Sequence, residues 1–99
     1  MDKPIVLTQE EIATRLKDLV GWKFADDKIS KQFEFKDFMD SLGFVNTLAP
    51  YFESMDHHPD IHIFYSKILF ELQRFDSGSK VTDRDFTVAT EVERQYSAR

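Results

Sequence analysis

Apolar residues repeat every three or four positions in two segments that each open with a capping box, a threonine followed three residues later by an acid. Thr8 and Glu11 begin the first segment, and Gly21 can adopt the left-handed conformation that ends a helix. Thr82 and Asp85 begin the last segment. The apolar positions are Ile12, Leu16, Leu19 and Val20 in the first segment and Phe86, Ala89, Val92 and Tyr96 in the last. This spacing predicts an amphipathic helix in each.

A third helical pattern lies in the middle of the chain and contains a proline. Asp37, with Asp40 three residues later, is a typical helix start. The apolar stripe that follows consists of Phe38, Leu42, Val45, Ala49 and Phe52. Pro50 removes one backbone hydrogen bond, which costs about 3 kcal/mol in a regular helix. We therefore expect the helix to bend at Pro50 or to break into two pieces.

Alternating apolar and polar residues predict strands between the helices. Residues 22–24 and 29–35 flank Ala25-Asp26-Asp27, which is a turn sequence, so these segments should form a hairpin. Residues 61–65 and 68–75 are rich in β-branched and aromatic side chains and flank a tight turn at Ser66-Lys67. They predict a second hairpin, which a loop at residues 77–79 connects to the last helix.

The order helix, hairpin, helix, hairpin, helix predicts one α+β domain that spans residues 1–99. Four strands should form an antiparallel sheet, and three helices should cover one face of it as a second layer. The chain has 99 residues, of which 41% are hydrophobic and ten are phenylalanine, and this is enough for one core without disulfides or a structural metal.

Charge and cysteine content narrow the classes of function. A net charge of −5 argues against direct binding to nucleic acid or to an anionic membrane, because such binding needs clustered Lys and Arg. No apolar run approaches the roughly 18 residues of a membrane span. The chain has no cysteine, which excludes disulfides, thiolate metal sites and cysteine nucleophiles and fits a cytoplasmic protein.

The residues best suited to catalysis lie where the middle helix should end. Glu53 precedes His57 by four residues, so on a helix the carboxylate and the imidazole would share a face, and the carboxylate could hold the ring in one tautomer. His58 points about 100° around the same axis, and Pro59 stops the helix. Because imidazoles donate and accept protons near neutral pH, the segment is a candidate proton-transfer site.

Two other interpretations of these histidines stay open. Histidines near a helix C-terminus are often surface residues whose positive charge the helix dipole favours. A metal site is the second interpretation, because nitrogen and oxygen ligands are plentiful at His57, His58, His62, Glu53, Asp56 and Asp60. Pro59 argues against it by interrupting any helix that would align His58 with His62, so we predict no metal.

The same segment belongs to a set of stretches that together extend over nearly the whole chain. The stretches are Gly21-Trp22, residues 31–38, Gly43-Phe44-Val45, Glu53 with Met55-Asp56-His57-His58-Pro59, Tyr65 with Lys67, and Thr82-Asp83-Arg84-Asp85. The most specific is Glu-x-x-x-His-His-Pro, followed at fixed intervals by an aromatic residue and an aspartate. In these stretches the sequence resembles the pterin-4a-carbinolamine dehydratase family.

The resemblance implies a fold, an activity and an assembly. Family members have a four-stranded antiparallel sheet with three helices and form homodimers or homotetramers, partly by joining edge strands. They dehydrate 4a-hydroxytetrahydropterins, which aromatic amino acid hydroxylases release, to quinonoid dihydropterins, and so recycle tetrahydrobiopterin. They use neither a metal nor an organic cofactor.

The resemblance also implies roles for single residues. His57 would be an acid/base catalyst, His58 would bind and polarise the pterin, and Glu53 would orient a histidine. Asp85 would support the site from the start of the last helix, although a capping role alone also explains it. The candidate substrate-binding residues are Pro59, Asp85, Phe75, His62 and Trp22.

One position departs from the family pattern. The family usually has a third histidine, or a tryptophan, near the end of the fourth strand, where this chain has Phe75, and residues 73–76 contain no histidine. Phenylalanine can stack on a pterin but cannot transfer a proton, so we expect a weaker enzyme. His62 is a possible substitute if its side chain faces the cleft. Trp22 and Phe75 are also compatible with ordinary core packing.

The missing histidine keeps a noncatalytic function open. Some members of the family also act as partners of a transcription factor, and a scaffold released from catalysis could lose a catalytic residue. The alternative is therefore a dimerisation module of the transcription-coactivator type. Glu53, His57, His58 and Pro59 argue for catalysis, because a scaffold has no chemical need of them.

Overall fold

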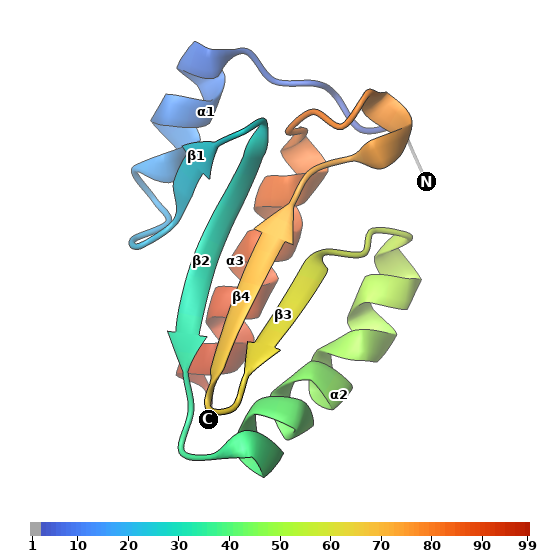
Figure 1. Cartoon of the computed structure of the whole chain (residues 1–99). Helices are drawn as coiled ribbons and strands as arrows, with labels where there is room; N and C mark the ends of the chain where they lie inside the picture. The colour runs from blue at the N-terminus through green and yellow to red at the C-terminus, as the bar shows by residue number, and fades with distance from the viewer. Residues whose placement is uncertain (1–2) are drawn as a thin grey trace.

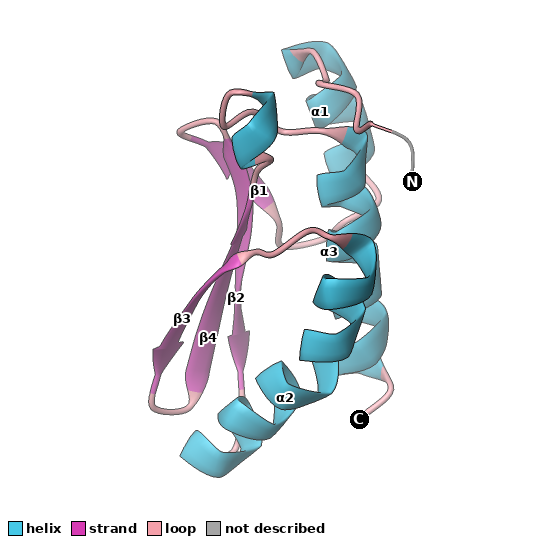
Figure 2. Ribbon diagram, turned by 90° about the vertical axis from the view of Figure 1, so that its right-hand side faces the viewer, coloured by secondary structure: helices cyan, strands magenta, loops and turns pink. Residues whose placement is uncertain are grey.

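Each strand and helix buries its apolar face between two layers. The computed structural model describes residues 3–99. Its elements are α1 (Gln9–Leu16), β1 (Lys23–Ala25), β2 (Lys28–Glu34), α2 (Phe38–Met55), β3 (Asp60–Phe64), β4 (Lys67–Leu72), the 3₁₀ turn η1 (Phe75–Ser77) and α3 (Asp83–Ser97). The strands form one antiparallel sheet in the order β1-β2-β4-β3 (Figure 1). The α-helices lie on one face of the sheet (Figure 2), which confirms the predicted α+β fold.

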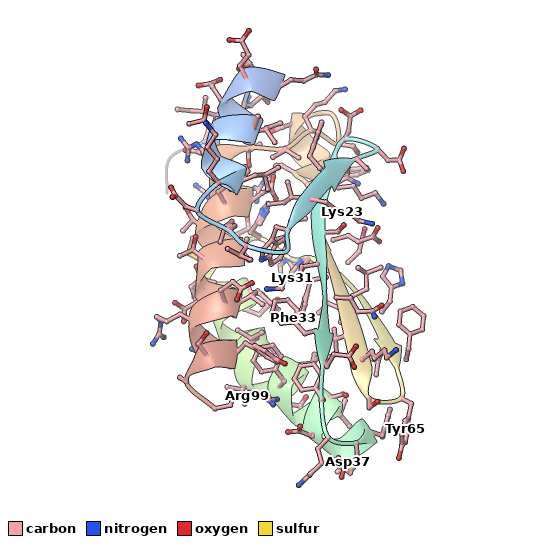
Figure 3. All side chains as sticks on the ribbon, turned by 90° about the vertical axis from the view of Figure 1, so that its left-hand side faces the viewer. Lys23, Lys31, Phe33, Asp37, Tyr65 and Arg99 are labelled. Carbon is pink, nitrogen blue, oxygen red and sulfur yellow. The ribbon has the colours of Figure 1, made fainter. Side chains whose placement is uncertain are left out.

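The helix-facing side of the sheet is the centre of the core. Ile68, Phe70 and Leu72 alternate along β4 and have no exposed surface. Phe33 of β2 packs against Phe70 at a centroid distance of 5.7 Å and against Tyr96 of α3 at 4.8 Å. Figure 3 shows Phe33 pointing from β2 toward α3. The intervening residues of β2 and β4 point to the opposite, open face of the sheet.

Capping boxes begin the first and last helices as predicted. Thr8 and Glu11 exchange hydrogen bonds at α1, and Asp85 is the N3 residue of the box at α3. The predicted extent of the first helix is wrong, because α1 ends at Leu16 and Val20 is exposed. Residues 17–19 form successive turns instead, which lead to Gly21 at φ 88° and on to β1.

Helix α2 runs unbroken through Pro50, so the expected break does not occur. Pro50 lies on the exposed side of the helix, while the neighbouring turns are held by buried side chains. The predicted stripe is correct only in part: Phe52 is buried and Val45 packs partly buried against the core, whereas Phe38 and Ala49 are exposed. The buried face consists of Ser41, Phe44, Leu48 and Phe52. Apolar residues surround much of α2, so their spacing does not define which face is buried.

The second hairpin differs from its prediction at both ends. Its turn falls at Tyr65-Ser66, one residue earlier than expected, and Tyr65 has φ 56°. Strand β4 ends at Leu72 and does not reach Phe75; its last pairs are Leu72 with Ile29 of β2 and Glu71 with Asp60 of β3. Residues beyond that point turn away from the sheet. Within residues 3–99, no helix is both long and apolar enough to cross a membrane.

Candidate functional site

The end of α2 turns His57 into the protein. α2 ends at Met55, and Asp56 takes the left-handed conformation with φ 48° and ψ 46°. The backbone N–H of His57 then donates to the carbonyl of Phe52 at 3.1 Å, which closes the last turn. His57 is only 2% exposed. The predicted contact between His57 and Glu53 is therefore wrong, because His57 lies beyond the helix and four-residue spacing does not apply there.

Asp85, which has no exposed surface, is the partner of His57. Its Oδ1 contacts Nε2 of His57, and its Oδ2 accepts from the backbone N–H of Thr82 at 2.7 Å and from the Thr82 hydroxyl at 3.1 Å. Asp85 thus caps α3 and orients His57 at the same time.

Arg74, in the segment between β4 and η1, contacts the other ring nitrogen of His57. Its Nη1 lies 3.1 Å from Nδ1 of His57 and donates to the carbonyl of Asp56 at 2.5 Å. Its Nη2 lies 3.7 Å from Oδ2 of Asp56. Sequence reasoning missed Arg74 because it searched residues 73–76 for a histidine only. Arg74 directly precedes Phe75, which was already a candidate site residue, and this neighbourhood could have identified Arg74 as a further candidate.

His58 has a different environment from His57. Its Nε2 lies 2.5 Å from Oε1 of Glu53, and its side chain is 55% exposed. Glu53 therefore contacts a histidine, as expected, but the adjacent one. Pro59 follows in a buried position and leads directly into β3.

A pocket of about 230 Å³ opens beside these side chains, between the end of α2 and the segment after β4. It is lined by Asp56, His57, His58, Gln73, Arg74 and Phe75. Phe75 is 84% exposed, so its ring stands at the rim of the pocket and does not fill it. The pocket thus combines two imidazoles, a guanidinium and an accessible aromatic ring.

Of the predicted residues, His57, His58 and Phe75 line this pocket. Glu53 and Asp85 do not line it but contact its two histidines, and Pro59 follows His58 without lining it. The other two predicted residues, His62 and Trp22, lie away from it. His62 pairs with Leu69 across the strands, lies on the open face of the sheet and contacts Glu71 at 2.7 Å. Trp22 is buried in the core, where its Nε1 donates to Glu93 at 2.9 Å. The register of β3 accounts for the position of His62, and the contacts of α3 with Trp22 and β2 account for that of Trp22.

The described residues do not bring together a set of side chains that could bind a metal ion. Within residues 3–99, no group of three or more histidine, aspartate or glutamate side chains is placed to hold a metal ion. His62 faces away from the pair at the end of α2, since β3 turns it to the open face. The imidazoles of the pocket are paired with carboxylates, an arrangement that suits proton transfer.

Comparisons with known proteins find a family that matches nearly the whole chain. The family described as pterin 4 alpha carbinolamine dehydratase matches residues 5–95. A protein of Sulfolobus acidocaldarius named after this enzyme is 36% identical over 89% of the chain and 96% of its own length. One from Koribacter versatilis, named in the same way, is 43% identical over 84% of the chain and 87% of its own length.

A solved structure is also similar. The crystal structure of a transcriptional coactivator/pterin dehydratase from Brucella melitensis superimposes with a TM-score of 0.84 at 33% identity. The match covers 91% of this chain and 97% of the Brucella chain.

Proposed function

Because the chain belongs to the pterin 4 alpha carbinolamine dehydratase family, we propose that it dehydrates a 4a-hydroxytetrahydropterin to the quinonoid dihydropterin by histidine acid/base catalysis. The observation that carries this proposal is the pocket in which His57 and His58 lie side by side in sequence, each contacting a carboxylate. In the family this reaction serves tetrahydrobiopterin recycling, and we propose the same role here.

The reaction needs a proton at one atom and removes a proton from another. The departing 4a-oxygen must gain a proton to leave as water, while a ring nitrogen forms a double bond to the same carbon and then loses its proton. An imidazolium can make the first transfer, and the imidazole that results can make the second. We propose that the histidine pair makes this exchange; His57 and His58 both line the pocket, and His58 is exposed there next to Glu53.

The pocket suits a small flat ring. Its volume of about 230 Å³ lies below the roughly 300 to 1,000 Å³ of sites for drug-sized ligands. The ring of Phe75 at the rim offers a surface on which a pterin can stack. Phe75 cannot replace the proton transfer of the family's third histidine, so we propose a rate below that of relatives that have it.

The test is the dehydration rate of a freshly generated 4a-hydroxytetrahydropterin in metal-chelated buffer. We expect the wild type to exceed the uncatalysed rate and His58→Gln to lose about 100-fold or more of that gain. His62→Gln is the matched control, because His62 also contacts a glutamate and is 47% exposed, but lies outside the pocket. A wild-type rate equal to the uncatalysed rate would refute the proposal.

The second candidate is a binding module of the coactivator type. The observation that favours it is the name of the Brucella protein, which joins a transcriptional coactivator with a pterin dehydratase. Phe75→His separates the two functions. An inactive wild type that gains activity through Phe75→His would indicate a binding module on an enzyme that has lost a catalytic residue.

We also propose a homodimer or homotetramer. Strand β3 is at the edge of the sheet, and a further strand can pair with an edge. Phe64 and Tyr65 are exposed where β3 ends, and Figure 3 shows Tyr65 at the tip of the hairpin. Light scattering on wild type and on Ile63→Pro, which blocks pairing along β3, tests this assembly. A monomeric wild type would refute it.

A further inference from the structure

The segment after β4 forms one wall of the pocket and carries Phe75 at its rim. Phe75 is 84% exposed, so the place of its ring depends on the backbone that carries it. That backbone closes on itself, because the N–H of Arg74 donates to the carbonyl of Lys80 at 2.9 Å and the N–H of Ser79 donates to the carbonyl of Arg74 at 3.0 Å. Residues 74–80 therefore form a compact loop beyond the end of the sheet.

The side chain of Gln73 connects this loop to the turn between β1 and β2. Its amide nitrogen donates to the carbonyl of Ser79 at 2.9 Å and to the carbonyl of Asp27 at 3.2 Å. Carbonyl oxygens can only accept hydrogen bonds, so the end of the amide that lies between them is the NH₂ group. Gln73 is half-buried and lines the pocket itself. One side chain thus joins the two ends of the loop to a separate hairpin.

The turn that receives this contact is well suited to hold the loop. Asp26 and Asp27 have φ 54° and φ 60°, and Ala25 pairs with Lys28 across them. A two-residue turn with both central residues left-handed matches the twist of the strands that it joins. The carbonyl of Asp27 is therefore presented by a tight hairpin of the sheet.

A second contact between the same two segments is weaker. Nζ of Lys80 lies 3.0 Å from Oδ2 of Asp27, but the two side chains are 51% and 53% exposed. Solvent screens such a pair, so it contributes little. The loss of a half-buried donor has the larger effect, because it leaves two acceptors without their partner. The amide of Gln73 is thus the main connection between the loop and the hairpin.

We propose that Gln73 is a positioning residue, whose amide fastens the loop of residues 74–80 to the β1–β2 turn and so holds Phe75 at the rim of the pocket. The part that concerns the substrate rests on the proposed function, in which a pterin stacks on Phe75. A ring that is already in place need not be ordered when the substrate binds, which favours binding. Gln73 therefore acts on substrate affinity through Phe75.

The first test is independent of activity and measures amide hydrogen exchange by NMR. Gln73→Ala and Gln73→Glu both remove the donors, so the amides of Arg74 and Ser79 should exchange about tenfold faster than in wild type. Gln73→Lys keeps donors at this position and should keep the wild-type rates. A pure charge effect would instead move Gln73→Glu and Gln73→Lys in opposite directions. The amide of Phe70 in the central strand β4 is the internal reference and should not change.

The second test is steady-state dehydration kinetics on the same variants. Gln73→Ala and Gln73→Glu should raise KM about three- to tenfold with a smaller change in kcat, because the contact acts on binding. Gln73→Lys should stay near the wild-type KM. Gln32→Glu is the matched control, since Gln32 is exposed on β2 and does not line the pocket.

A double-mutant cycle decides whether Gln73 acts through the ring of Phe75. In the Phe75→Ala background, Gln73→Ala should not raise KM further. A rise in KM that persists in full in this background would show that Gln73 contacts the substrate itself and would overturn the positioning role.

Two further results contradict the proposal. Unchanged amide exchange in Gln73→Ala would show that the amide does not hold the loop. Faster exchange with an unchanged KM would show that holding the loop has no effect on substrate binding. A wild type without dehydratase activity would refute the proposed function, while the exchange rates would still decide whether Gln73 fastens the loop.

Discussion

His57 and His58 are adjacent in sequence, and each contacts a carboxylate, yet their surroundings differ almost completely. His57 is 2% exposed and is enclosed by Asp85 and Arg74. His58 is 55% exposed and contacts Glu53, which is itself exposed. The difference arises because the left-handed turn at Asp56 directs one side chain inward and leaves the next at the surface.

The comparison indicates that the contacts of buried His57 matter mainly for folding and that those of exposed His58 matter mainly for catalysis. A buried carboxylate with three hydrogen-bonded partners has a large effect on folding, because its removal leaves buried donors unsatisfied. An exposed ion pair contributes little to stability, since solvent screens its charges. It can still matter for catalysis, where the charge acts on the proton being transferred. Substitutions around His57 should therefore be detected by denaturation, and substitutions around His58 by kinetics.

Asp85→Ala should have the largest effect. It removes the cap of α3 and leaves Nε2 of buried His57 without its partner, so we expect the free energy of unfolding to fall by about 3 kcal/mol. Urea denaturation measures this change. Asp83→Ala is the control, because Asp83 lies in the same helical turn but is less buried. An equal loss in both variants would refute the special role of Asp85.

Glu53→Gln should have its effect on activity. Glutamine is nearly the same shape but has no charge to stabilise the imidazolium of His58, so kcat should fall about tenfold. The free energy of unfolding should change by less than about 0.5 kcal/mol, because the pair is exposed. Dehydration kinetics and urea denaturation on the same variant measure both. A loss of stability without a loss of kcat would reverse the comparison.

The fold could be predicted from local patterns because the deciding features are local. Capping boxes at Thr8 and Thr82 and the alternation in the hairpins depend on residues a few positions apart. The buried face of α2 could not be predicted in this way. Helix α2 carries apolar side chains on several sides. Phe44 and Leu48 are buried because they lie on the side that contacts β3, β4 and α3.

The site could be predicted only in part, for a related reason. The sequence predicted the histidine pair and Glu53 as candidates, and the two histidines line the pocket. It paired Glu53 with His57, whereas Glu53 contacts His58, because helical spacing does not continue past the end of α2. Arg74 and His57 are 17 residues apart, and His57 and Asp85 are 28 apart. Contacts of that kind depend on how the ends of three elements converge, which no local pattern contains.

Phe75→Ala should have a moderate effect. If a pterin stacks on the ring at the rim, its loss should raise KM about two- to tenfold with kcat unchanged. Stability should not change, because the side chain is exposed. Phe64→Ala removes an exposed phenylalanine outside the pocket and should leave KM at the wild-type value. Steady-state kinetics decide, and an equal KM in Phe75→Ala and wild type would exclude stacking.

The smallest effect should come from a third histidine and carboxylate pair, His62 with Glu71 on the open face of the sheet. Burial raises the pKa of Glu71, but hydrogen bonds from His62 and Lys28 and their charges outweigh it and hold the pKa below its ordinary value of 4.5. A lowered pKa in the folded state stabilises the fold above pH 4.5, and this contribution is lost as the pH falls through the folded pKa. The free energy of unfolding of wild type should therefore fall between pH 7 and pH 3. In Glu71→Gln this fall should be smaller by a few tenths of a kcal/mol. Its dehydratase rate should equal that of wild type, because neither His62 nor Glu71 lines the pocket beside His57 and His58; a reduced rate would mean that this pocket is not what distinguishes Glu53 from Glu71.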